Sequence, residues 1–171
     1  MEEEKNLLKE IAAGSYNASD RPFDFVDADA ETALVCEPDD RVRERISKAL
    51  RNLGYQIIEA SEAIEAIKSM RFHVYDVVVV NEIIDPSAPD KNDVLAYLET
   101  LSIATRRQIF VALLSNRYRT MDNMSAFNRS VNIVINVKNI DDVGAIVKGA
   151  VADNAAFYRV FRDILKKMGR I

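Results

Sequence analysis

From residue 32 onward, the chain alternates between short apolar runs and helically spaced apolar stripes. The runs lie at residues 33–36, 55–59, 76–80, 109–114 and 131–137, and each predicts a strand. The stripes lie at residues 41–53, 61–70, 93–103, 120–129 and from 140 onward, and each predicts a helix. Gly54 is placed to end the first helix, and Ser61 and Asn139 are placed to cap later ones. Strands that are apolar throughout are buried on both faces, so the pattern predicts an α/β fold, a doubly wound five-stranded parallel sheet with helices on both faces.

The first 31 residues have a different pattern, in which few apolar residues stand among many acids. Leu7, Leu8 and Ile11 have helical spacing, and Phe23 and Phe25 form a small apolar group among aspartates. So few large apolar side chains cannot build a core. We therefore interpret residues 1–31 as an acidic, partly helical arm and residues 32–152 as the domain.

The last helical stripe is unusually long, running from residue 140 to about residue 168 without a proline. We expect residues 153–171 to extend this helix beyond the domain. The extension would present Phe157, Tyr158, Phe161 and Leu165 to solvent, which is a sizeable apolar surface. Either the acidic arm or a second copy of the chain, as a helical dimer, would cover it.

Composition excludes several classes of site. Cys36 is the only cysteine and His73 the only histidine, so the chain has no internal disulfide, multi-cysteine zinc site or His-rich metal site. The glycines are isolated, which argues against the familiar nucleotide-binding loops. No pair of a nucleophile and a base stands out, so we expect no enzyme and no cofactor. The acidic opening residues are unlike a signal peptide and favour a cytoplasmic location, with no membrane segment.

The net charge of −4 is unevenly distributed. Residues 1–40 carry 12 acids and three bases, whereas residues 104–140 carry six bases and one acid. These opposite charges could attract each other, or each could meet a partner.

Polar side chains collect where the predicted strands end, which is where sites form in doubly wound sheets. Glu37 and Asp39 follow the first strand, Asn81 follows four valines of the third, Ser115 follows the fourth, and Lys138 follows the fifth. In this order and spacing, residues 33–152 resemble the receiver domain of two-component response regulators, which has a flavodoxin-like fold. The resemblance implies that paired acids hold Mg²⁺, that an aspartate after the third strand accepts a phosphoryl group, and that a Ser or Thr and a Lys contact that group.

The chain departs from the receiver pattern at the positions that carry the chemistry. Asn81 stands at the acceptor position, and an amide oxygen is too poor a nucleophile to form an acyl phosphate. Pro38 replaces one acid of the pair, so Glu37 and Asp39 would form at most a weak Mg²⁺ site. We expect Lys138 to pair with Glu37 or Asp39 in a vestigial pocket.

These features predict a pseudo-receiver, a non-catalytic signalling module that acts through protein partners or self-association. Its expected contact surface is the fourth helix, fifth strand and last helix. The residues of that surface are Arg117, Arg119, Arg129, Phe157, Tyr158, Phe161 and Leu165. One alternative is a phosphorylatable regulator that uses Mg²⁺ with Asp39, Asp40 or Glu82. Another is a nucleic-acid-binding regulator that uses residues 104–140, against which stands an acidic pI near 5.1.

Overall fold

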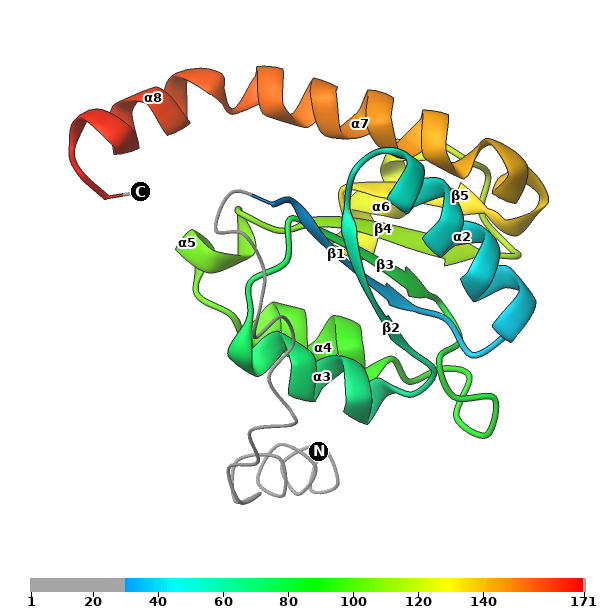
Figure 1. Cartoon of the computed structure of the whole chain (residues 1–171). Coiled ribbons are helices and arrows are strands. Elements are labelled where there is room, and N and C mark those ends of the chain that lie inside the picture. The colour runs from blue at the N-terminus through cyan, green and yellow to red at the C-terminus, as the bar shows by residue number, and fades with distance from the viewer. Residues whose placement is uncertain (1–29, 171) are drawn as a thin grey trace.

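A five-stranded sheet forms the centre of the computed structural model, which describes residues 30–170 (Figure 1). The strands are β1 (Thr32–Cys36), β2 (Gln56–Ala60), β3 (Val77–Asn81), β4 (Phe110–Ser115) and β5 (Ile133–Asn136). Their order is β2-β1-β3-β4-β5, and every neighbouring pair is parallel. The predicted doubly wound α/β fold is therefore confirmed.

Helices cover both faces of this sheet, as continuous apolar strands require. They are α2 (Asp40–Asn52), α3 (Ala63–Phe72), α4 (Asp93–Thr100), α6 (Asn123–Asn128) and α7 (Val143–Phe157), whereas the short α5 (Ile103–Arg106) buries none of its residues. Val77 and Val79 of β3 pack in the cluster that contains the buried faces of α2 and α7. Val78 and Val80 pack in the other cluster, with α3, α4 and α6. All four valines are fully buried.

Two predicted helix boundaries are wrong. The stripe at residues 93–103 is divided into α4 and α5, because Leu101 is extended and Ser102 begins a new helix by accepting from the Thr105 N–H. Ser61 does not cap α3. Its N–H and its hydroxyl donate instead to the Glu65 carboxylate. Gly54 does end α2, and its φ of +98° is a conformation that favours glycine.

The long C-terminal stripe forms three successive helices instead of the one predicted. A 3₁₀ helix, η2 (Val137–Asp142), leads into α7, and α8 (Arg159–Lys167) follows. Asn139 lies inside η2 with non-helical dihedral angles and caps nothing. Tyr158, with φ −92° and ψ 7°, separates α7 from α8. The predicted domain edge at residue 152 lies within α7, so no break in the backbone marks it.

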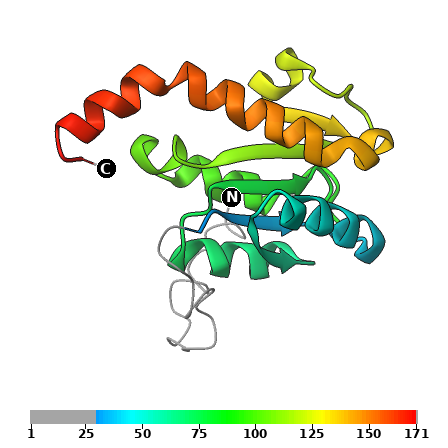
Figure 2. The same ribbon diagram turned by 45° about the horizontal axis from the view of Figure 1, so that its top comes forward.

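The last helices run antiparallel to β5 and extend past the edge of the sheet at which the strands begin. Figures 1 and 2 show α8 beyond the sheet, on the side of α5. The Arg107 guanidinium there lies 5.3 Å from the centroid of the Phe161 ring. The predicted arm lies outside the described residues, except for Ala30 and Glu31. Within residues 30–170, no helix combines the length and the apolar character needed to cross a membrane.

Candidate functional site

Glu37 and Asn81 meet where β1 and β3 end. The Asn81 amide donates to Glu37 Oε2 at 2.7 Å, and the Asp39 N–H donates to Glu37 Oε1 at 2.9 Å. Asn81 Oδ1 accepts from the Ile83 N–H at 2.8 Å. Glu37 is only 2% exposed, and burial raises the pKa of its carboxyl group although both hydrogen bonds oppose the shift. The amide of Asn81 is thus held as a hydrogen-bonding group between Glu37 and the loop after β3.

The residues of this pocket fit a Mg²⁺ ion poorly. Asp39 is the N-cap of α2, and its Oδ1 accepts from the N–H groups of Arg41 and Val42. Both oxygens of Glu37 accept hydrogen bonds, and Pro38 brings no ligating side chain. Among the described residues, no three His, Cys, Asp or Glu side chains cluster in a way that could hold a metal ion. At the weak Mg²⁺ site predicted here, the Glu37 carboxylate is therefore hydrogen-bonded to Asn81, and the Asp39 carboxylate caps α2.

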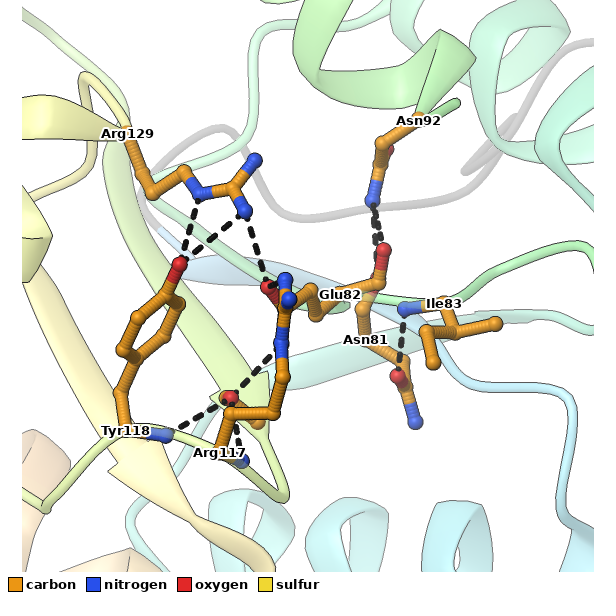
Figure 3. A network of polar contacts seen from close by, with 8 residues as sticks. Asn81, Glu82, Ile83, Asn92, Arg117, Tyr118 and Arg129 are labelled. Carbon is orange, nitrogen blue, oxygen red and sulfur yellow. Dashed lines mark hydrogen bonds and ion pairs between the residues drawn. The ribbon is translucent and has the colours of Figure 1, made fainter. Parts of the chain in front are cut away.

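Glu82, the next residue along the chain, is the centre of a second and larger polar network (Figure 3). Its Oε2 accepts from the Ser115 hydroxyl at 2.7 Å and from Arg117 Nε at 3.3 Å. Its Oε1 accepts from Arg117 Nη2 and, at 3.1 Å, from Arg129 Nη2. The Glu82 side chain is 6% exposed, and burying a charged carboxylate costs free energy. The two arginines and the Ser115 hydroxyl offset this cost.

The electrostatic balance of this network favours the charged form of Glu82. Burial pushes the pKa of Glu82 up, but the hydrogen bonds from Arg117 and Ser115 and the charges of Arg117 and Arg129 outweigh it and lower the pKa. The hydrogen bond to Glu82 is the main cause of a raised pKa at Arg117. Glu37 and Glu82 follow neighbouring strands at the same edge of the sheet, and their pKa shifts have opposite signs.

Further contacts tie the network to the loops around it. Ser115 Oγ accepts from the N–H groups of Arg117 and Tyr118, so the hydroxyl fixes the start of the loop after β4. Arg129 also donates to the Tyr118 hydroxyl at 3.1 Å. Asn92 caps α4 and donates to the carbonyls of Asn81 and Glu82 at 2.9 and 3.1 Å, which secures the loop after β3.

The expected pairing of Lys138 with Glu37 or Asp39 is wrong for the described structure. None of the ion pairs within residues 30–170 involves Lys138, whose backbone N–H donates to Asn136 Oδ1. Instead, Arg43 of α2 lies beside Glu37 and donates to its carbonyl at 2.7 Å. The Glu37 carboxylate is therefore stabilised by the hydrogen bond from Asn81 and by the charge of Arg43, which is the role expected of Lys138.

The predicted contact residues fall into two groups at opposite edges of the sheet. Arg117 and Arg129 lie together on Glu82, at the edge where the strands end. Arg119 is exposed in the loop before α6. Phe157 and Phe161 are 81% and 39% exposed, on the helices that extend past the opposite edge, where Tyr158 and Leu165 are half-buried.

The sequence did not reveal Glu82 as the centre of a polar network. Successive side chains of a strand point in opposite directions, so the residue after Asn81 is expected to point away from the acceptor pocket. It does point elsewhere, toward Ser115, which the receiver pattern assigns to the phosphoryl group. The available signal was a carboxylate after β3 and an arginine just after β4, since these two strands are neighbours in the sheet.

The chain matches no protein-family model and no curated protein in sequence. In fold, it is similar to a candidate response regulator from Chloroflexus aurantiacus, with a TM-score of 0.59, 18% identity, and coverage of 72% of this chain and 98% of that one. The receiver domain of response regulator 1452 from Francisella gives a TM-score of 0.56, 18% identity, and coverage of 72% and 98%.

NtrX from Brucella abortus, solved in complex with ADP, gives a TM-score of 0.61 and 18% identity. The match covers 82% of this chain but only 30% of NtrX, which is much longer. At this level of identity the similarities establish the fold. The described part of the chain has the flavodoxin-like fold of response-regulator receiver domains.

Proposed function

We propose that this protein is a receiver-like signalling module that is not phosphorylated at position 81 and that acts through protein contacts, in the cytoplasm. The observation that carries the proposal is the state of the two polar groups that the receiver pattern assigns to phosphoryl transfer. Asn81 is an amide hydrogen-bonded to Glu37, and Ser115 donates to Glu82. Neither group is arranged to form or hold an acyl phosphate.

The alternative acceptors among the acids at this edge are all engaged by other groups. Asp39 caps α2, Asp40 pairs with Arg43, and Glu82 is held by Arg117 and Arg129. A carboxylate that two guanidinium groups neutralise is a weakened nucleophile, because its negative charge is stabilised in the ground state. This argues against a phosphorylatable regulator that uses an atypical acid.

The alternative of nucleic-acid binding loses part of its main support, which was the cluster of six bases at residues 104–140. Arg117 and Arg129 share the single negative charge of Glu82. Arg106 donates to the carbonyls of Ile109 and Ser130. A nucleic-acid interface needs cations that are available to phosphates, and these three are directed to the protein itself.

The contact surface that we propose includes α6 and the loop before it. Met124 and Phe127 are 69% and 79% exposed on α6, and Arg119 is exposed nearby. Exposed aromatic, Met and Arg side chains are enriched in protein interfaces. The Glu82 network anchors this region through Arg129, which follows α6, and through Tyr118, which lies in the loop after β4.

Amide NMR spectra of the full chain test the proposal. Adding Mg²⁺ and a small phosphodonor should leave the signals of Asn81, Glu82 and Ser115 unchanged, because no phosphoryl group binds between them. Concerted shifts of these signals on adding the phosphodonor would contradict the proposal. For the contact surface, cross-linking in cells should capture a partner that Arg119→Glu/Phe127→Ser loses. The control variant Lys48→Ala, on α2 at the opposite face of the sheet, should retain it.

A further inference from the structure

A groove of about 370 Å³ lies between α5 and the segment formed by Tyr158, α8 and Arg170, at the edge where the strands begin. Ile103 of α5 forms one wall, and Tyr158, Phe161 and Leu165 form the apolar part of the other. Ile103 is 68% exposed and Phe161 is 39% exposed. Open apolar surface of this kind marks a site that another group covers.

The rim of the groove is strongly basic. Arg107, Arg162 and Arg170 line it, and its lining contains no acidic side chain. The Arg107 guanidinium lies over the Phe161 ring, which combines cation and aromatic face in one wall. The occupant that fits best therefore carries apolar or aromatic side chains interspersed with carboxylates.

The first 29 residues of this chain have that composition. They carry eight acids and three bases, and the part nearest the domain reads Phe-Asp-Phe-Val-Asp-Ala-Asp from Phe23 to Asp29. Aromatic residues and aspartates are interspersed in it, as the groove requires. The earlier apolar residues Leu7, Leu8 and Ile11 stand much farther from the domain along the chain.

The point at which this segment joins the domain lies close to the groove. Thr32 begins β1, and its carbonyl accepts from the Asp76 N–H at 3.1 Å, while the Asp76 carbonyl accepts from the Phe110 N–H at 2.8 Å. Phe110 begins β4 directly after α5, so two strand spacings, about 10 Å in total, separate the starts of β1 and β4. Phe25 stands seven positions before Thr32 in the chain, and a stretch of that length spans up to about 23 Å when extended. The segment is long enough to reach the groove.

We infer that residues 23–29 of the same chain dock in this groove, with Phe23 and Phe25 against Ile103 and Phe161, and with the aspartates facing Arg107 and Arg162. Attachment to β1 gives the segment a high effective concentration at the groove, which a second copy of the chain lacks at low protein concentration. The arm would thus cover the apolar end of the last helices intramolecularly.

Disulfide trapping in the full chain tests this inference. Cys36 is fully buried and burial raises the pKa of its thiol, so the native cysteine does not compete. The trapping pair is Ala28→Cys with Ala104→Cys on the exposed side of α5, which leaves both phenylalanines in place. The matched control is Ala28→Cys with Asn52→Cys, an exposed position at the end of α2 that lies away from the groove, near the start of β2 and so within similar reach of β1.

Under mild oxidation, we expect an intramolecular disulfide in the Ala28→Cys/Ala104→Cys protein to form at least about tenfold faster than in the control. Adding Phe23→Ser/Phe25→Ser, or separately Arg162→Glu, should bring the rate close to that of the control. Equal rates in the trapping and control pairs would overturn the inference. Predominant formation of disulfide-linked dimers would overturn it too, and would assign the groove to a second copy of the chain.

Discussion

The hydroxyl of Ser115 donates to Glu82 at 2.7 Å, in a network whose two cations come from Arg117 and Arg129. Ser115 ends β4 and Glu82 follows β3, so the contact joins neighbouring strands at the edge where a receiver carries its chemistry. The same hydroxyl accepts from two N–H groups of the next loop. A buried glutamate and a serine together thus hold the loops after β3 and β4 in one arrangement.

Arg129→Ala should destabilise the protein because it removes one of two cations from a buried carboxylate. Removing a partner of a fully buried pair costs about 3–5 kcal/mol and an exposed pair is worth under about 1 kcal/mol, so we expect roughly 1–2 kcal/mol for this partly exposed arginine. Urea denaturation measures the change. Arg119→Ala, which removes an exposed arginine of the same region, is the matched control and should have little effect. Equal destabilisation by both variants would show that the network contributes nothing specific.

The lowered pKa of Glu82 predicts a loss of stability in acid. A carboxyl group whose pKa is lower in the folded state stabilises the fold above its unfolded value, near 4.5, and this contribution disappears as the pH falls through the folded value. Glu82→Gln should therefore be less stable than the wild type at pH 7, and the difference should shrink below about pH 4. Denaturation midpoints of both proteins from pH 7 to pH 3 test this. A difference that stays constant with pH would contradict it.

Asn81→Asp should be destabilising at neutral pH. It replaces an amide that donates to Glu37 at 2.7 Å with a second carboxylate, and two carboxylates at this separation cannot both ionise without a large penalty. One of the two pKa values should rise, so the variant should recover stability between pH 7 and pH 5 relative to the wild type. Asn81→Ala, which loses the hydrogen bond without adding charge, is the control and should show no such recovery.

Lys138→Ala should leave the denaturation midpoint almost unchanged, within about 0.5 kcal/mol, because no described acid pairs with this side chain. A loss comparable to that of Arg129→Ala would indicate an interaction of Lys138 that the described structure lacks.

The fold could be predicted from the sequence because the strands carry a strong and local signal. Four consecutive valines before Asn81 are typical of a strand whose side chains are buried on both faces of a sheet, and β3 is such a strand. The ends of helices were predicted less well, since they depend on individual hydrogen bonds. Ser61 is a residue type that often caps helices, but its hydroxyl donates to Glu65 instead. Tyr158 interrupts the helix, although the helical spacing of apolar residues continues on both sides of it.

The partners of the site residues could not be predicted, because spacing fixes which strand a residue follows and leaves its side-chain contacts open. The alignment of strand ends places Glu37, Asn81, Ser115 and Lys138 at one edge of the sheet. It does not indicate that Arg43 replaces Lys138 beside Glu37, or that Glu82 engages Ser115. These choices depend on side-chain reach across neighbouring elements.

Intact-mass spectrometry of the full chain, after incubation with Mg²⁺ and a small phosphodonor, shows whether any residue at this edge of the sheet accepts a phosphoryl group. A receiver domain with an acceptor aspartate, treated in parallel, shows that the reagents are active. We expect the protein to keep its original mass, because Asn81 offers an amide in place of a carboxylate and Glu82 is held by two arginines. A gain of one phosphoryl group, mapped to Asn81, Glu82, Asp39 or Asp40, would show instead that the protein is a phosphorylatable regulator.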